Sequence, residues 1–378
     1  MSRPGRFERR GVVEGFFGPL WSMSHRRQLL EFGAEKGVNT YLYAPKDDPY
    51  HRARWSDPYP SRQWKSLLQL IRHAQARGID FVYGFHPGHG LCFSDPRPVQ
   101  ALLAKAQRFY DAGGRTFALL FDDIPSRLEH AIDRKNFANS LARAQGTWLQ
   151  TIHERQPGIW KNVEWWLCPS YYTPDPLLAR TFGAFEPHFL HTLAECLPAD
   201  VACFWTGPGV VSKQIGLAHV RKIANQIKHK LILWDNYPVN DLSMRDELHI
   251  GPLKGRDSGL PQAVYGYLNN PLLQEDLGFI PLATCFDYAA NPSAYRPEAS
   301  WTRIIRERFG SQALTYWRVI RDFCETLSRC KQSKKPLQLS PQERRSLKAA
   351  SDYIRDHQRQ KWAREIRPWR DLMRKVLD

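Results

Sequence analysis

A chain of 378 residues can bury a large hydrophobic core, and this length fits one large domain with an appendage. Hydrophobic residues make up 42% of the sequence and aromatic residues 12%, without a low-complexity tract, which excludes an intrinsically disordered chain. No apolar run approaches the roughly 20 residues of a membrane-spanning helix, and no apolar signal segment follows the basic start "MSRPGRFERR", so we expect a cytoplasmic protein.

The seven cysteines are scattered and form no CxxC pair, which argues against a disulfide framework and against a zinc site. The formal net charge is +16, and residues 301–378 hold 20 Lys and Arg against 9 Asp and Glu, a difference of +11. Such a segment is either a solvated basic helical face or a surface for an acidic polymer. No nucleic-acid recognition motif accompanies the charge, so nucleic acid is not an expected partner.

Eight short β-rich runs alternate with helical patterns through most of the sequence. The predicted strands are residues 10–16, 38–44, 80–85, 116–121, 162–168, 200–205, 231–235 and 262–268. Helical patterns lie between them, and those at 61–78 and 99–114 end in glycine, the usual residue after a helix C-terminus. Most of the strands are apolar on both faces, which is typical of a parallel sheet.

Eight strands are the number that closes a (β/α)8 barrel, so we predict an α/β fold of the TIM-barrel type. The alternative is a doubly wound open sheet, which usually carries a Gly-rich phosphate-binding turn after its first strand. The stretch "EGFFGPLW" stands there instead, with the wrong glycine spacing and bulky aromatic residues.

The character of the sequence changes after residue 290, where strand patterns stop. Helical patterns cover residues 300–310, 314–330 and 340–377. Ser340 and Glu343 fit a capping box at the start of the last pattern. We therefore predict two parts, a catalytic barrel at 1–295 and a basic helical C-terminal region at 296–378.

Polar and aromatic residues follow every predicted strand, in the stretches "EGFFG", "APKDD", "HPGHG", "DDIP", "CPSYY", "WTGPG", "WDNYPVND" and "NNP". In a barrel the C-terminal ends of the strands meet at one face, where active sites lie. Aromatic faces combined with fixed polar groups suit a polyhydroxylated ligand such as a sugar.

Asp122 and Asp123, directly after the apolar run "TFALLF", allow four interpretations. A magnesium site of a nucleotide-hydrolysing enzyme lacks its G-x-x-x-x-G-K-[ST] partner. One Asp could cap a following helix, or the pair could bind a metal together with His86, His89 and Cys92. The fourth interpretation is catalysis, because adjacent carboxylates repel and one of them then keeps its proton while the other is ionised.

The adjacent spacing restricts the catalytic mechanism. In an ordinary retaining glycosidase the nucleophile and the acid lie about 5–5.5 Å apart across the scissile bond and usually come from different strands. Neighbours at one strand end suit a substrate-assisted route, in which the acetamide of the substrate attacks the anomeric carbon. One acid then orients the acetamide, and the other protonates the leaving oxygen.

The stretches "GVVEGFFGPLWS", "NTYLYAPKDDPYHR", "FALLFDDI", "FWTGP" and "LWDNYPVND" resemble glycoside hydrolase family 84, the family of O-GlcNAcases and bacterial β-N-acetylglucosaminidases and hyaluronidases. The resemblance runs through residues 11–295. It implies a (β/α)8 barrel that removes β-linked N-acetylglucosamine (GlcNAc) with retention, through an oxazoline intermediate and without a metal or other cofactor. The implied substrate is a β-GlcNAc-bearing glycoconjugate, either a glycoprotein or an oligosaccharide, and no membrane partner is implied.

Carried over position by position, the resemblance implies that Asp122 orients the acetamide and stabilises the oxazoline. Asp123 is then the general acid, and afterwards the base that activates water. The remaining implied residues bind the sugar: Tyr172 and Asn236 at the acetamide, Trp234 as a wall of its pocket, and Gly15, Lys46, Asp241 and Asn270 at the hydroxyls.

Each of these residues also has an ordinary structural interpretation. Gly15 could be a strand-end turn, Lys46 a surface cation and Trp234 plain core. The "NNP" assignment is ambiguous by one residue, and Asn270 is chosen because the family places its Asn directly before Pro. His86 and His89 are interpreted as structural residues.

Three further features qualify the resemblance. Phe17 stands where many members have Tyr, which removes one hydroxyl from the pocket rim. Some members pair through their helical regions, so a homodimer built with residues 300–378 is one expectation. A non-enzymatic barrel that binds a GlcNAc-bearing glycan or a polyanion is the alternative to the hydrolase, but a binder has no need for a repelling carboxylate pair.

Overall fold

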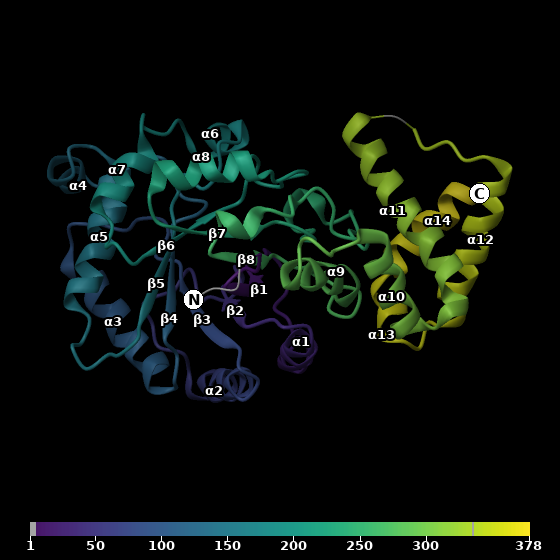
Figure 1. Cartoon of the computed structure of the whole chain (residues 1–378), viewed down its shortest axis with the longest axis horizontal. Helices are drawn as coiled ribbons and strands as arrows, with labels where there is room; N and C mark the ends of the chain where they lie inside the picture. Colours follow the sequence, from purple (N-terminus) through teal and green to yellow (C-terminus); the bar gives the residue numbers. More distant parts are fainter. Residues whose placement is uncertain (1–4, 335) are drawn as a thin grey trace.

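The computed structural model describes residues 5–334 and 336–378. Its eight strands are β1 (Arg9–Glu14), β2 (Thr40–Tyr43), β3 (Asp80–Phe85), β4 (Thr116–Leu120), β5 (Glu164–Cys168), β6 (Ala202–Trp205), β7 (Lys230–Asp235) and β8 (Gly266–Asn269). Each pairs in parallel with the next, and β8 pairs with β1, where Leu268 lies opposite Gly11 (Figure 1). The closed barrel confirms the predicted fold class and excludes the open sheet.

Helices surround the barrel in chain order. They are α1 (Met23–Glu35), α2 (Ser61–Gln75), α3 (Pro96–Asp111), α4 (Ala131–Asn136), α5 (Leu141–Arg155), α6 (Pro176–Phe182), α7 (Phe189–Cys196), α8 (Leu217–Ile227) and α9 (Phe279–Ala290). Two 3-10 turns, η1 (Leu242–Met244) and η2 (Leu260–Gln262), both lie in the connection between β7 and β8. The eighth strand starts later than predicted, because η2 and the buried Val264 belong to the connection rather than to the sheet.

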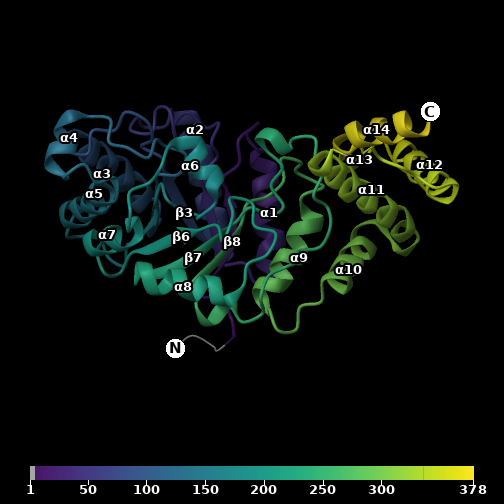
Figure 2. The same cartoon turned by 90° about the horizontal axis from the view of Figure 1, so that it is seen from above.

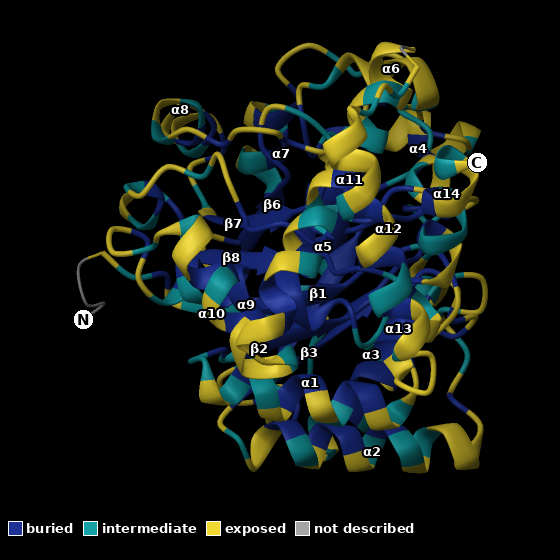
Figure 3. Cartoon of the chain, turned by 90° about the vertical axis from the view of Figure 1, so that its right-hand side faces the viewer, coloured by how far each residue is buried: buried dark blue, intermediate teal, exposed yellow. Residues whose placement is uncertain are grey.

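The strands are apolar on both faces because each face packs against a separate apolar layer. Inside the barrel, side chains such as Val13, Leu42, Leu120 and Trp166 fill the interior. Outside, the strands pack against the helices, and the strands form the buried centre in Figure 3. This double burial explains the unbroken apolar runs in the sequence.

The C-terminal part contains α10 (Pro297–Phe309), the turn η3 (Ser311–Ala313), α11 (Leu314–Ser333), α12 (Pro341–Asp356), α13 (Lys361–Glu365) and α14 (Arg367–Leu377). These helices lie beside the barrel (Figure 2). Their core includes the buried Trp301, Trp317, Trp362 and Trp369 and continues into α9 through Ile280. The division of the chain at residue 295 stays a prediction.

The predicted helical pattern at 340–377 is interrupted twice. Ser340 forms the predicted capping box with Glu343, which confirms the start of α12. The pattern is then divided into α12, α13 and α14. Pro368 stands in the first turn of α14, where its missing N–H costs nothing, so a new helix begins there rather than the old one continuing.

Candidate active site

One cavity of about 370 Å³ at the C-terminal ends of the strands is lined by all nine residues that the resemblance implied. They are Gly15, Lys46, Asp122, Asp123, Tyr172, Trp234, Asn236, Asp241 and Asn270. The barrel closure brings together residues as far apart as Gly15 and Asn270, which are separated by 255 positions and joined by a hydrogen bond. The roles of these residues in a reaction stay predictions.

Asp122 is a buried carboxylate held by a buried cation. The Lys46 ammonium donates to Oδ2 of Asp122 and forms an ion pair with it. Burial, the largest single effect, raises the pKa of this carboxyl. The charge and hydrogen bond of Lys46 and the neighbouring His86 and His51 together outweigh burial and lower the pKa to about 2. Oδ1 has no hydrogen-bond partner among the described residues, so one acceptor of an ionised carboxylate remains available.

His86 is a buried histidine that contacts the backbone of Asp122. Its Nε2 lies 3.0 Å from the backbone oxygen of Asp122. Burial, and secondly the charge of Lys46, lower the pKa of His86 to about 3, so the imidazole is neutral at neutral pH. Because a carbonyl oxygen can only accept, the proton of this neutral ring is on Nε2. The structural interpretation of His86 agrees with this contact.

Asp123 faces the same cavity in a different electrostatic environment. Its backbone φ is 60°, in the left-handed region that Asp tolerates better than most residues. In an extended strand consecutive side chains point to opposite faces, so this local reversal allows both carboxylates to line one cavity. The Tyr172 hydroxyl donates to Oδ1 of Asp123 at 2.9 Å. Burial and the negative charge of Asp122 raise the pKa of Asp123 above its ordinary value.

The structure removes two of the four interpretations of the carboxylate pair. The next helix, α4, begins at Ala131 with His130 at its N-cap, so neither Asp122 nor Asp123 caps it. His89 is exposed, and the Cys92 thiol lies 3.6 Å from Asp133 instead. Across residues 5–334 and 336–378, no three His, Cys, Asp or Glu side chains cluster as metal ligands would.

A chain of amide hydrogen bonds builds the opposite wall of the cavity. The Gly15 N–H donates to Oδ1 of Asn270 at 3.3 Å, and Nδ2 of Asn270 donates to Oδ1 of Asn236 at 2.9 Å. The same Asn236 oxygen accepts from the Trp234 indole at 3.0 Å. Asn236 Nδ2 donates to the backbone oxygen of Val210, so the protein already uses both ends of this amide.

The two asparagines of "NNP" lie in different surroundings, and the choice of Asn270 as the sugar-binding one stays a prediction. Asn270 lines the cavity, whereas the buried Asn269 donates to the backbone oxygen of Tyr237 at 3.1 Å and does not line it. The backbone of Gly15 lies against the Trp234 indole, because a Cβ there would lie 2.3 Å from Cζ2 of Trp234. No side chain fits at residue 15 unless the indole moves.

Asp241 lines the cavity just before η1. Its Oδ2 accepts from the Phe17 N–H at 2.8 Å, and burial raises the pKa of its carboxyl. The connection that follows also lines the cavity, through Leu242 and Ser243.

Several lining residues were not singled out in the sequence. They include Cys168, Asp175, Leu177, Thr206, Val210, Val211, Val239 and Met244, whereas Phe17, which the sequence placed at the rim, lines the cavity as expected. Most of them follow a predicted strand within ten residues, which is the only sequence signal that points to them. Asp175 accepts from the Val210 N–H at 3.0 Å and caps α6, so its carboxylate holds two segments of the wall together.

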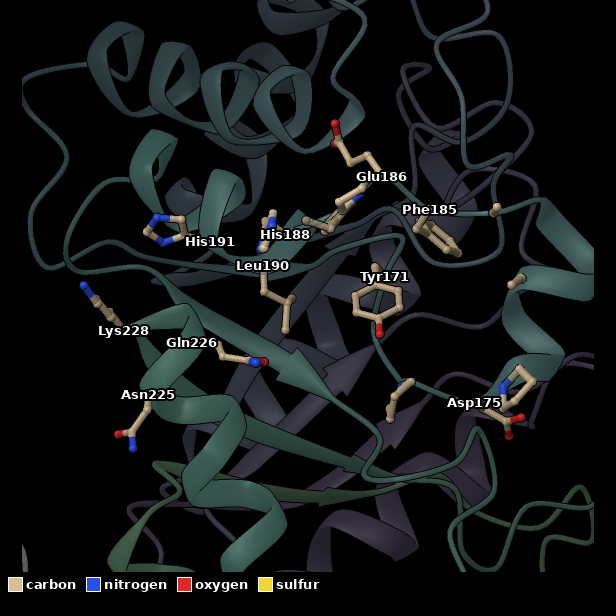
Figure 4. A pocket seen from close by; sticks show the side chains of 16 residues that line it. Tyr171, Asp175, Phe185, Glu186, His188, Leu190, His191, Asn225, Gln226 and Lys228 are labelled. Carbon is tan, nitrogen blue, oxygen red and sulfur yellow. The ribbon is translucent and has the colours of Figure 1, made fainter.

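A larger hollow of about 700 Å³ lies on the flank of the barrel, between α6, α7 and the end of α8 (Figure 4). Tyr171 faces this hollow, whereas the next residue, Tyr172, faces the candidate site. Asp175 lines both, but none of the nine implied residues lies in the flank hollow. The smaller cavity is therefore the candidate active site.

Within residues 5–334 and 336–378, no helix has the length and apolar character needed to cross a bilayer.

Comparisons with known proteins agree with the resemblance seen in the sequence. The model of the family described as β-N-acetylglucosaminidase matches residues 10–324. The protein O-GlcNAcases of Rattus norvegicus and Mus musculus are each 33% identical over 296 residues, which are 77% of this chain and 31% of theirs. The chain thus spans about a third of the length of these curated relatives.

A solved structure has the same architecture over almost the whole chain. It is a mutant of the O-GlcNAc hydrolase from Thermobaculum terrenum, with a TM-score of 0.84 and 30% sequence identity. The match covers 98% of this chain and 82% of that one. The chain therefore belongs to the β-N-acetylglucosaminidase family of glycoside hydrolases, glycoside hydrolase family 84.

Proposed function

We propose that the chain is a retaining exo-β-N-acetylglucosaminidase that hydrolyses terminal β-linked GlcNAc by substrate-assisted catalysis. The main support for the proposal is that the two adjacent carboxylates differ in their ionisation. Lys46 keeps Asp122 ionised, whereas burial and the charge of Asp122 raise the pKa of Asp123. An anion and a proton donor side by side are the two groups that this mechanism needs.

In the first step the acetamide oxygen of the substrate attacks the anomeric carbon and forms an oxazoline. Oδ1 of Asp122, which lacks a partner among the described residues, accepts the acetamide N–H and stabilises its positive charge. Asp123 gives its proton to the glycosidic oxygen while the bond from that oxygen to the anomeric carbon breaks. The aglycone leaves as an alcohol, and Asp123 is left ionised.

In the second step Asp123 takes a proton from a water molecule, and the water oxygen attacks the anomeric carbon. The oxazoline opens, the acetamide is restored, and GlcNAc is released with its original β configuration. Asp123 is again protonated, so no external reactant besides water is consumed.

The size of the cavity supports exo action. Its volume of about 370 Å³ lies near the lower end of the range of roughly 300–1,000 Å³ for small-molecule sites. That space suits one terminal sugar ring better than an internal segment of a glycan chain. We propose a GlcNAc-bearing glycoprotein or oligosaccharide in the cytoplasm as the substrate, and two relatives carry the name protein O-GlcNAcase.

The role of Asp123 is tested with two aryl β-GlcNAc substrates that differ in their leaving groups. With 4-methylumbelliferone, which needs protonation, we expect Asp123→Asn to lose about 10²–10⁴-fold in kcat/KM. With dinitrophenol, which leaves without a proton, the loss is expected to be small. Asp122→Asn is expected to slow the hydrolysis of both substrates, because the acetamide of the substrate, which is the nucleophile, loses the carboxylate that orients it and stabilises its positive charge. Unchanged hydrolysis by Asp123→Asn with the methylumbelliferyl substrate contradicts the assignment.

Asp175→Asn is the matched control, since this carboxylate lines the same cavity but caps α6 and binds a backbone N–H. Asn is an equally good helix cap, so we expect kcat/KM of Asp175→Asn to depend on the leaving group as that of the wild type does.

Substrate assistance is tested by weakening the nucleophile in the substrate. Replacing the N-acetyl group by N-trifluoroacetyl withdraws electrons from the acetamide oxygen and is expected to lower kcat strongly. Proton NMR of the first-formed product is expected to show the β anomer. A kcat that does not change with fluorination, or an α product, contradicts the substrate-assisted route. Neither result contradicts the proposal that the chain hydrolyses β-GlcNAc. Sugar binding without any turnover favours the non-enzymatic binder instead.

A further inference from the structure

A basic groove lies on the C-terminal helices. It has a volume of about 780 Å³ and is lined by six cations, Arg344, Arg345, Lys348 and Arg355 of α12 and Arg370 and Arg374 of α14. The two helices pack side by side at the end of the molecule away from the barrel (Figure 1). We call this hollow the basic groove.

The helix periodicity explains why the cations gather there. Leu347 and Ile354 of α12 are buried in the core of the C-terminal part. Trp369 and Met373 of α14 are buried in the same core. The opposite faces are left to solvent, and residues four apart lie above one another on a helix. Arg344 and Lys348 therefore form one charged stripe, and Arg370 and Arg374 form a second one, on neighbouring helices.

Most of this charge is uncompensated. Within the described ranges, Arg344, Arg345, Lys348 and Arg374 form no ion pair with a carboxylate. Arg344 donates to the backbone oxygen of Leu377 and Arg345 to the Gln342 amide, which neutralises neither charge.

The other two cations are already engaged. Arg355 pairs with Asp352 at 2.7 Å, and Arg370 pairs with Asp371 at 2.9 Å. The groove lining contains six cations against two carboxylates, Asp352 and Asp378, so the surface attracts anions.

We propose that the basic groove binds an acidic polypeptide segment, whose carboxylates pair with the four free cations. Guanidinium groups match carboxylates in a bidentate manner, and three of these four cations are arginines. A single-stranded nucleic acid fits less well, because proteins hold such strands by stacking bases on aromatic side chains. No aromatic residue is among those that line the groove. This surface is separate from the catalytic cavity and does not depend on the proposed hydrolase activity.

The test uses the full chain and a fluorescein-labelled decaglutamate peptide, with binding followed by fluorescence anisotropy. We expect saturable binding that weakens as the salt concentration rises, because the contacts are ionic and exposed. The double variant Lys348→Glu/Arg374→Glu places two negative charges in the groove. We expect it to weaken binding by about tenfold or more, since two ion pairs become repulsions.

The matched control is Arg359→Glu/Lys375→Glu. It changes the net charge by the same amount on neighbouring positions that do not line the groove, and Lys375 directly follows Arg374. We expect this control to bind decaglutamate within about threefold of the wild type. Equal weakening by both double variants overturns the proposal, because binding then follows net charge alone. Absence of saturable binding at low salt also overturns it.

A labelled ten-nucleotide oligo-dT provides the second arm. Tighter binding of oligo-dT than of decaglutamate, lost in the groove variant alone, replaces the peptide by nucleic acid as the occupant. Thermal melting and hydrolysis of an aryl glycoside check that both double variants are folded. The milder Lys348→Gln/Arg374→Gln is expected to give an intermediate affinity, and it replaces the charge reversal if that variant melts early.

Discussion

Lys46 and Asp122, which are 76 positions apart in the chain, form an ion pair that is buried in the wall of the candidate active-site cavity. Lys46, together with the neighbouring His86 and His51, outweighs burial and lowers the pKa of Asp122 to about 2. Burial, and secondly the negative charge of Asp122, raise the pKa of Asp123 beside it. Lys46 also lowers the pKa of Asp123, but burial and the charge of Asp122 exceed that effect, so the two carboxylates differ in ionisation.

The first prediction concerns Lys46→Met. Without the cation, burial dominates and the pKa of Asp122 rises from about 2 into the range where enzymes are assayed. Since the proposed mechanism needs Asp122 ionised, the acidic limb of the kcat/KM profile is expected to move to higher pH. Activity on that limb falls about tenfold for every pH unit by which the limb moves. A pH profile with a chromogenic substrate measures this.

Lys65→Met, an exposed lysine on α2, is the control and is expected to leave the profile unchanged. Lost activity with an unmoved acidic limb contradicts the electrostatic role and reduces Lys46 to a ligand of a sugar hydroxyl.

The second prediction concerns Tyr172→Phe. Burial raises the pKa of Asp123 most, and the hydrogen bond from Tyr172 opposes this rise. Its removal raises the pKa further, so Asp123, the proposed general acid, keeps its proton to higher pH. We expect the alkaline limb of kcat/KM to move upward in pH, with a lower rate at the optimum. The neighbouring Tyr171→Phe faces the flank hollow and is the control; equal movements of the limb in both variants refute the assignment.

The third prediction concerns Gly15→Ala. The new methyl group would lie 2.3 Å from Cζ2 and 2.8 Å from Cη2 of Trp234, so the indole must move and its bond to Asn236 breaks. A displacement of about 1 Å in such a wall can cost about a hundredfold in activity, which steady-state kinetics detects.

Gly158→Ala is the matched control, because nothing lies within 4 Å of a Cβ there. The double variant Gly15→Ala/Trp234→Phe is expected to regain part of the activity, since the smaller ring leaves room. Wild-type kinetics in Gly15→Ala would show that this wall is adaptable.

The fourth prediction concerns a contact between the barrel and α11. Glu247 accepts from the Ser328 hydroxyl, and the Lys331 ammonium donates to the backbone oxygen of Ser243 in the cavity wall at 2.8 Å. A hydrogen bond from His249 contributes most to lowering the pKa of Glu247, to about 2 against the ordinary 4.5. The contribution of Glu247 to stability is therefore present above pH 4.5 and is lost as the pH falls toward 2.

We expect Glu247→Gln to lower Tm at pH 7 and to differ progressively less from the wild type at pH 4 and pH 3. Differential scanning fluorimetry measures both proteins. Glu35→Gln, an exposed residue of α1, is expected to have little effect. A Tm difference that grows as the pH falls contradicts the prediction.

The strand ends were the most informative part of the sequence, but they did not separate acids inside the cavity from acids outside it. Glu14 and Asp235 also stand at strand ends. Both are buried in ion pairs outside the cavity, Glu14 with Arg26 and Asp235 with Arg256, each at 2.6 Å. A pattern of polar residues after a strand does not show which face of the barrel each side chain lies on. Nor does it show which cation, remote in sequence, pairs with each acid.

The sequence alone predicts the alternation of strands and helices, the barrel and the position of Asp122 and Asp123 at the end of β4. These properties depend on hydrophobic periodicity and backbone geometry, which are local and can be read along the chain. Three features could not be predicted without the folded chain: Lys46 pairs with Asp122, Asn270 rather than Asn269 lines the cavity, and α12 and α14 place their cations around one groove. The physical reason is that burial and Coulomb interactions depend on distances in space, and barrel closure and helix packing set those distances between residues remote in sequence.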